Sequence, residues 1–228
     1  MILDHLKKNA LVSAHVFHNN NKGNPDVLTK LKYSSTADFL LDRARMMEST
    51  EPLTWEQFDY LRGVADNAGP EVFEPKRCYT NSMSLVLADT HRRMSYVEGY
   101  CYSGLSPVHH SWVLLDGRLV DLTRSLRGKE AVDEFLRGEP PQADLKDRVL
   151  GVIPDGWQYF GMKFLRETVR KYVCKFDQYG SLIDNYVCDD GRTLFELGRL
   201  GNFDPPDPNW WTEMMTSIKP SRPENGAK

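Results

Sequence analysis

Hydrophobic positions along the first third of the chain recur with the spacing of helices. Residues 1–20, ADFLLDRARMM from Ala37 and TWEQFDYLRGVAD from Thr54 each repeat apolar side chains at helical intervals, which is typical of amphipathic helices. NNNKGNPD interrupts the chain after the first of them. Thr54 is a suitable N-cap, and Gln57, three positions later, completes a capping box. We therefore expect residues 1–70 to form an N-terminal helical region.

Another helical pattern begins close to Cys78. Apolar residues follow the i, i+4, i+7, i+8 spacing of one helix face: Tyr79, Met83, Val86 and Leu87. A proline three positions before the cysteine suits a segment that is not yet helical. At a helix start, unpaired N–H groups and the positive end of the dipole favour a thiolate over a thiol. Cys78 is therefore a candidate nucleophile, and the alternative is a buried, inert cysteine.

The segments after this helix have the pattern of strands. Residues 94–104, MSYVEGYCYSG, are rich in tyrosine and contain no proline, which favours a strand. In HHSWVLLDGRLVDLT, residues 109–123, an Asp-Gly pair stands between two apolar runs. Such a pair is the strongest short signal for a hairpin with a type I′ turn. A two-residue turn at 116–117 would place Leu115 opposite Arg118.

This hairpin register decides which of two adjacent histidines meets an aspartate. Side chains alternate between faces along a strand, so His110 shares a face with Asp121 as its diagonal neighbour, whereas His109 points to the opposite face. A carboxylate beside an imidazole fixes its tautomer and stabilises its charged form. His110 is therefore the candidate base, and the alternative is a surface hairpin in which the pair arises by chance.

Four short blocks follow one another in the middle of the chain: Cys78-x-x-Asn81, Tyr96-Val97-Glu98-Gly99-Tyr100, His110-Ser111-Trp112 and Val120-Asp121-Leu122-Thr123. Their order and spacing resemble the core of the transglutaminase-like cysteine enzymes, which belong to the wider papain-like group. The resemblance covers Arg77 to Arg124. It implies an α+β fold in which a cysteine-bearing helix packs on an antiparallel sheet. It also implies that Cys78 is the nucleophile, His110 the base and Asp121 the orienting acid.

The resemblance leaves the oxyanion site open. Papain-like proteases place a glutamine a few residues before the cysteine, and residues 73–77 contain none. Candidate donors and substrate contacts are the Cys78 main-chain N–H and the side chains of Gln57, Trp55, Asn81 and Trp112. For Gln57 a capping role is favoured over an oxyanion role.

These residues indicate a thiol-dependent hydrolase or acyltransferase that acts on an amide bond through a thioester. Water as the acceptor would give a peptidase, amidase or deamidase, and an amine would give a transglutaminase. The substrate would be a protein, a peptide or a small amide, and the chemistry requires no cofactor. The alternative is a catalytically weak or inactive papain-like binding module, such as a phage or bacterial effector, which the missing glutamine and a tryptophan-rich tail favour.

Composition narrows the partners and the compartment. A net charge of −3 from 29 basic and 32 acidic residues supports neither nucleic acid nor an anionic membrane as a partner. No apolar run approaches the ~18 residues of a membrane span, and MILDHLKKNALV lacks the features of a secretory signal. Four cysteines without a CxxC pair indicate a reducing cytoplasm. His15 and His18 lack further ligands nearby, so no metal site is expected.

The remaining segments complete the expected organisation. Residues 71–195 are expected to form the catalytic core and residues 196–228 a C-terminal extension. KEAVDEFLRG predicts a short helix, WQYFGMKF from Trp157 a further strand, and LRETVRKYV and RTLFELGRL two more helices. Trp210 and Trp211 are expected to pack on the body of the protein, and the last ten residues to be disordered.

Overall fold

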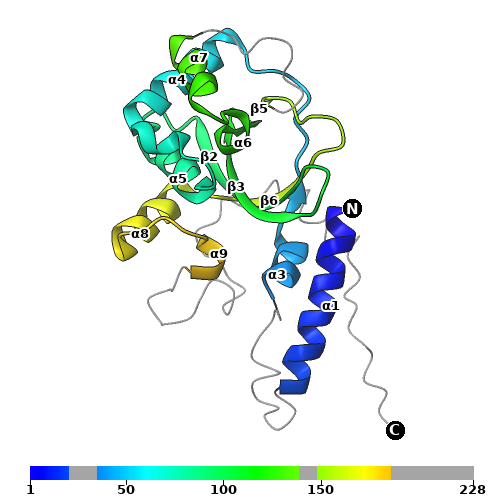
Figure 1. Ribbon diagram of the computed structural model, residues 1–228. Coiled ribbons are helices and arrows are strands. Elements are labelled where there is room, and N and C mark those ends of the chain that lie inside the picture. Colours follow the sequence, from blue (N-terminus) through cyan, green and yellow to red (C-terminus); the bar gives the residue numbers. More distant parts are fainter. Residues whose placement is uncertain (21–34, 139–147, 186–228) are drawn as a thin grey trace, which may run out of the picture.

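The protein has an α+β fold, with helices packed around an antiparallel sheet (Figure 1). The computed structural model describes residues 1–20, 35–138 and 148–185 of the 228-residue chain. In chain order the elements are α1 (Ile2–Asn20), α3 (Thr36–Arg43), β1 (Arg45–Met46), α4 (Trp55–Ala68), the 3₁₀ helix η1 (Pro70–Phe73), α5 (Cys78–Ala88), β2 (Met94–Tyr102), β3 (Val108–Leu115), β4 (Arg118–Asp121), α6 (Leu122–Ser125), α7 (Lys129–Arg137), β5 (Val149–Leu150), β6 (Gln158–Phe164), α8 (Arg166–Phe176) and α9 (Leu182–Asn185).

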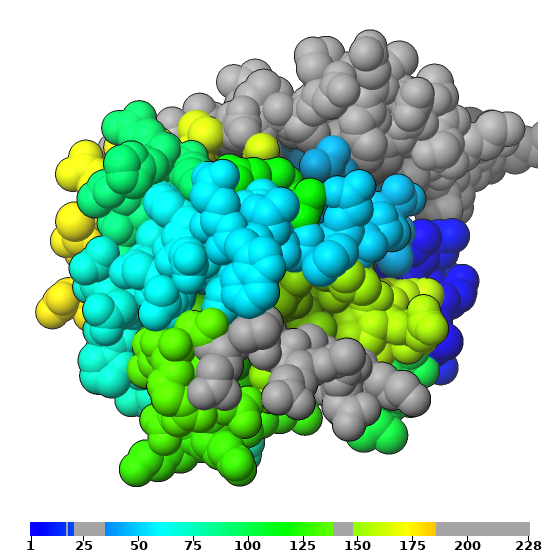
Figure 2. Space-filling model, turned by 90° about the horizontal axis from the view of Figure 1, so that it is seen from above, coloured from blue at the N-terminus to red at the C-terminus, as the bar shows by residue number. Residues whose placement is uncertain are grey.

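The described strands form one six-stranded sheet in the order β1-β6-β2-β3-β4-β5, and every neighbouring pair is antiparallel. The sheet curves strongly, α4, α5 and α7 lie together beside it, and α1 projects away from the body (Figure 1). Figure 2 shows the surface that α4 and the residues before it form at one end, with α7 alongside.

Each face of the sheet carries its own apolar cluster. The larger one joins the sheet to α1, α3, α4, α5 and α8. The smaller one lies on the other face and consists of Met47, Val97, Cys101, Trp112, Leu114, Leu119, Val149 and Tyr159. The sheet is therefore buried on both sides, and polar groups on either face must find partners within the protein.

The hairpin predicted from the Asp-Gly pair is present. Leu115 pairs with Arg118 and Leu114 with Leu119. Asp116 and Gly117 have φ angles of 49° and 86°, the positive values that a type I′ turn requires at both central positions. The strands predicted at 94–104 and in WQYFGMKF are β2 and β6.

The helices predicted in the N-terminal region are present, with one correction. The helix expected over ADFLLDRARMM ends at Arg43, and Arg45–Met46 form an edge strand that pairs with Phe160 and Gly161 of β6. Pairing with a distant strand has overridden the local helical pattern. Residues 1–70 thus supply part of the sheet as well as helices. Thr54 and Gln57 form the predicted capping box at the start of α4.

The later helical predictions are confirmed where the structure describes them. KEAVDEFLRG and LRETVRKYV correspond to α7 and α8. RTLFELGRL, Trp210, Trp211 and the C-terminal tail lie outside the described residues. No helix in the described ranges is long and apolar enough to cross a membrane.

Candidate active site

The start of α5 meets the sheet where β3 extends beyond β4. Hydrogen-bonded pairing of β3 with β4 covers Val113 to Leu115, so the β3 edge at His110 and Ser111 is not covered by that strand. Helix α5 packs against β2 and β3, and Cys78 is its first residue. The thiol therefore lies near His110 at a part of the β3 edge that β4 does not cover.

His110 and Asp121 are joined as the hairpin register predicts. The imidazole Nε2 lies 2.7 Å from Asp121 Oδ2, and both side chains are buried. Because Nε2 faces the carboxylate, Nδ1 is the nitrogen left for the Cys78 thiol, which lies close enough to this histidine for each group to shift the pKa of the other. The three predicted residues thus form one continuous chain of contacts.

The surroundings of Cys78 favour the thiolate. Burial is the largest influence and raises the pKa of the thiol, but the hydrogen bond and charge of His110 lower it, and so do the N–H and the hydroxyl of Ser111. The net pKa lies below its ordinary value. Within the described residues, the Ser111 hydroxyl makes no well-aligned hydrogen bond. It lowers the pKa of the thiol because it lies close to the sulfur.

His110 is held in its charged form. Burial is again the largest influence and lowers the pKa of the imidazole, but the Asp121 charge and hydrogen bond outweigh it, and Cys78 adds to them. The resulting pKa is about 9. A lowered thiol pKa and a raised imidazole pKa both favour the thiolate and the imidazolium over the neutral pair.

Asp121 accepts hydrogen bonds from three directions. Oδ2 accepts one hydrogen bond from His110 Nε2 and another from the Tyr159 hydroxyl at 2.8 Å. Oδ1 receives the main-chain N–H of Arg124 at 3.1 Å and so caps α6. Burial raises the pKa of this carboxyl, but the charge and hydrogen bond of His110, with Tyr159 and Arg124, bring it below the ordinary value. The Asp121 carboxyl group is therefore a buried, ionised acceptor.

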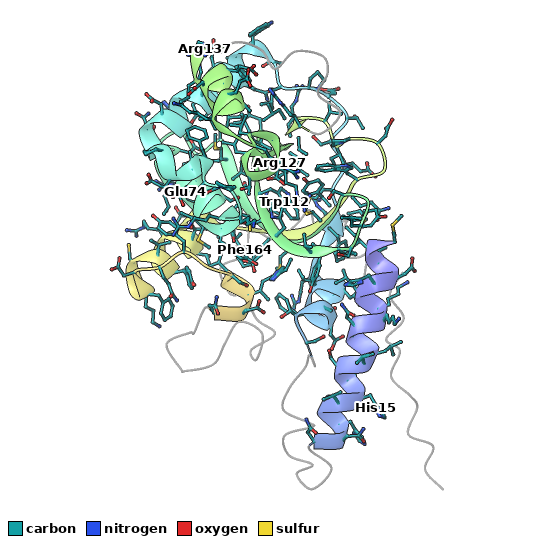
Figure 3. All side chains as sticks on the ribbon, viewed as in Figure 1. His15, Glu74, Trp112, Arg127, Arg137 and Phe164 are labelled. Atoms are coloured by element: carbon teal, nitrogen blue, oxygen red, sulfur yellow. The ribbon has the colours of Figure 1, made fainter. Side chains whose placement is uncertain are left out.

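Trp112 packs the imidazole from its own strand. The indole is fully buried and stacks on His110 with ring centroids 6.2 Å apart, and it meets Tyr159 edge-on at 5.0 Å. Figure 3 labels it within the curve of the sheet. The six-membered ring of the indole lies against Gly161, where a Cβ atom would come within 2.6 Å of it. Its indole N–H is buried without a partner among the described residues. The observed contacts of Trp112 therefore hold the His110 ring in place.

The side chain of Gln57, one of the candidate oxyanion donors, is hydrogen-bonded to other groups. Gln57 accepts from the Thr54 N–H through Oε1 and donates to Asp116 through Nε2. Asp116 is six residues from His110 along the chain, or about 20 Å of strand, so the structure does not bring Gln57 to the thiol. The capping alternative for Gln57 is the one observed.

The Asn81 amide also donates elsewhere, and Trp55 lies at the surface. Asn81 lies one turn after Cys78, and its amide donates to the Glu74 carbonyl at 2.8 Å and to Thr123 Oγ1 at 2.9 Å. These bonds tie α5 to the segment before it and to α6. Trp55 is 63% exposed and packs edge-on against Phe58. The Cys78 main-chain N–H is the sequence-based candidate that lies at the reacting atom.

His109 lies on the opposite face of β3, as the register predicts. Its Nδ1 is 3.2 Å from the Tyr79 hydroxyl, its Nε2 is 3.3 Å from Glu98 Oε1, and its ring stacks on Tyr100. Burial lowers its pKa, the nearby Asp184 charge opposes this shift, and the His110 charge adds to it. The pKa values of the two adjacent histidines are thus shifted in opposite directions.

Sequence reasoning missed Tyr159 and Ser111 as parts of the site. Tyr159 lies in a segment correctly predicted as a strand, but its place beside Asp121 depends on β6 pairing with β2, where it stands opposite Cys101. No local pattern encodes that pairing. Ser111 had a local signal, because it directly follows His110, but its alternate position assigned it to the other face.

No group of three or more His, Cys, Asp or Glu side chains in the described ranges is arranged to hold a metal ion. Cys78, Cys101 and Cys174 are free thiols. Comparison of the chain with protein-family models, with curated proteins and with solved structures gave no match, so the site is interpreted from its own geometry.

Proposed function

We propose that this protein is a thiol-dependent hydrolase or acyltransferase that acts on an amide bond. The single observation that carries the proposal is the buried chain from the Cys78 thiol through His110 to Asp121, with 2.7 Å between the last two. Nucleophilic catalysis by cysteine requires an activated sulfur, a base and a group that orients the base. Each part lies within contact of the next.

The chemistry follows from the charges of the three groups. The Cys78 thiolate attacks the amide carbonyl carbon, and the C–N bond breaks as the His110 imidazolium gives its proton to the leaving amine. The acyl group remains on sulfur as a thioester. His110, now neutral, takes a proton from water or from an amine as that acceptor attacks the thioester. Asp121 stays ionised and holds the imidazole throughout.

The oxyanion of each tetrahedral intermediate needs hydrogen-bond donors. The Cys78 main-chain N–H stands at the first residue of α5, where helix geometry provides no carbonyl partner, and the helix dipole favours negative charge there. We assign this N–H as one donor. Because each such donor contributes about 3 kcal/mol, a site with this donor alone would turn over slowly.

The arrangement supports a transglutaminase-like or papain-like core. Helix α5 with Cys78 at its start packs on antiparallel strands, and β3 and β4 carry the base and the acid in the expected order. We propose this core as the finer description of the α+β fold. We also propose a reducing compartment such as the cytoplasm, since it would keep Cys78 a free thiol.

The first experiment measures alkylation of each cysteine by iodoacetamide between pH 5 and pH 9, resolved by mass spectrometry. Cys78 is expected to react well below pH 7. Cys101 is the internal control, because burial raises its pKa to about 12. The second experiment supplies a glutamine-containing protein and a fluorescent primary amine, and measures amine incorporation and ammonia release. Cys78→Ala should abolish both.

The second candidate function is a binding module that retains the three residues without efficient turnover. It is favoured by the commitment of the Gln57 and Asn81 amides to other partners. Equal, slow alkylation of all four cysteines would support this candidate and contradict the first. An activated Cys78 would support the enzyme.

A further inference from the structure

Tyr159 is a fully buried tyrosine whose hydroxyl group contacts the acid of the site. It lies on β6 and donates to Asp121 Oδ2 at 2.8 Å. This is the same oxygen that receives His110 Nε2. The ring packs edge-on against Trp112. The proposed chemistry transfers no proton to or from this hydroxyl, so its position calls for another explanation.

The hydrogen-bond donors around Asp121 determine which ring nitrogen of His110 carries a proton. The Arg124 N–H can only donate, and the Tyr159 hydroxyl has the carboxylate as its partner. With Tyr159 donating, Oδ2 acts as an acceptor, so the contact at 2.7 Å requires a proton on His110 Nε2. That tautomer leaves Nδ1 as the nitrogen that exchanges a proton with the thiol.

We infer that Tyr159 is a positioning residue that anchors the orienting oxygen of Asp121 and thereby fixes the tautomer and direction of the His110 ring. The inference rests on the proposed function, because it concerns the same base. Without the hydroxyl, Oδ2 would keep the hydrogen bond from His110 and the more distant charge of Arg124, while Oδ1 still caps α6. The carboxylate could then turn out of line with the imidazole, which would weaken the pair with Cys78.

Other titratable groups face these atoms and must be considered in any pH measurement. Arg124 lies beside Asp121, with Nε 4.0 Å from Oδ2, and both Arg124 and Cys101 act on Tyr159. His109 and His110 repel each other when charged. None of these groups is altered by removal of the Tyr159 hydroxyl, so a comparison of variants isolates its effect.

The test is the pH profile of Cys78 alkylation by iodoacetamide in wild type, Tyr159→Phe and Asp121→Asn. A hydrogen bond to a charged group corresponds to about a tenfold effect, so Tyr159→Phe should slow alkylation at pH 6 by about tenfold. In Tyr159→Phe the acidic limb of the alkylation profile should move to higher pH. Asp121→Asn should move it in the same direction and by a larger amount. Phenylalanine keeps the ring that packs on Trp112, so the fold should remain.

Tyr172→Phe is the matched control. Tyr172 is also fully buried, but its hydroxyl accepts from Gln178, and it belongs to the larger apolar cluster, whereas Tyr159 belongs to the smaller one. Removal of the Tyr172 hydroxyl should change the melting temperature and leave the pH profile of Cys78 alkylation unchanged. A Tyr159→Phe profile equal to wild type, or shifted to lower pH, would overturn the inference while leaving the enzyme proposal intact. A wild-type Cys78 without activation would instead overturn both.

Discussion

A Cβ atom on Gly161 would lie 2.6 Å from Cη2 of Trp112, which makes the glycine of β6 a condition for the position of the indole. Gly161 stands in one row across the sheet with Gly99 and His110. Gly161 leaves the space that the Trp112 ring occupies, whereas a Cβ atom on Gly99 would meet the backbone of Phe160 and Gly161. The histidine is thus oriented by hydrogen bonds at its edge and by packing at its face.

Gly161→Ala is therefore expected to disturb the site from a position that carries no functional group. The methyl group must displace the indole, and overpacking of this kind costs about 1–3 kcal/mol. The displaced Trp112 should release His110 and slow Cys78 alkylation at pH 6. Thermal melts and alkylation rates measure the two effects.

Gly63→Ala is the control for that substitution. Gly63 lies in α4, and an added Cβ would meet nothing within 4 Å. Alanine should stabilise this helix by about 0.5–1 kcal/mol and leave the alkylation rate unchanged. If Cys78 of the Gly161→Ala variant were alkylated at the wild-type rate, the indole would not be what orients the histidine.

The two adjacent histidines should differ in function. His110→Ala removes both the base and the counter-ion of the thiolate, so activation of Cys78 and turnover should be lost together. His109→Ala should leave the Cys78 profile unchanged and alter stability by about 1 kcal/mol, because His109 contacts Tyr79 and Glu98 on the other face. Alkylation of Cys78 at pH 6, with melts as a fold control, measures the difference. Loss of activation in the His109 variant alone would reverse the assignment of the base.

Gln57→Ala separates capping from catalysis. The substitution removes the bond that the Gln57 side chain accepts from the Thr54 N–H and the bond that it donates to Asp116. The main-chain N–H of residue 57 can still donate to Thr54, so this partial loss of the cap should cost about 1 kcal/mol. The melting temperature should fall, while the rates of alkylation and of acyl transfer stay at wild-type values once the protein is folded. A large fall in turnover with unchanged stability would return Gln57 to the list of oxyanion donors.

Glu98 should make the protein less stable at alkaline pH. This carboxyl group is fully buried on β2, where it accepts from the Leu182 N–H at 2.8 Å, from Tyr96 and from Ser181. Burial, the largest influence, raises its pKa from 4.5 to about 8. Between these two values the folded state binds more protons than the unfolded chain. The free energy of unfolding should therefore fall as pH rises from 4.5 to about 8, and this contribution is constant above that.

Glu98→Gln should remove this part of the pH dependence. The amide does not ionise, and its oxygen can still accept from Leu182 at the start of α9. Urea unfolding of both proteins between pH 5 and pH 9 measures the difference in free energy. Glu74→Gln is the control, since that side chain is half exposed and pairs with Arg77 at the surface. Parallel curves for wild type and Glu98→Gln would contradict the prediction.

Local sequence was sufficient for the elements that carry the three main residues. The helical spacing after Cys78 determines where α5 begins, because apolar side chains at that period form one buried face. Asp116 and Gly117 determine the hairpin, because few residue pairs adopt positive φ at both positions. The register then follows from counting, and with it the side of the strand on which His110 and Asp121 meet.

Tertiary structure alone decided how these residues are held. Tyr159 reaches Asp121, and Gly161 makes room for Trp112, only because β6 returns to pair with β2 after more than 50 intervening residues. Arg45 and Met46 became a strand for the same reason. Strand pairing at such separations depends on burial and hydrogen bonding between distant segments, and neither leaves a periodic trace in the local sequence.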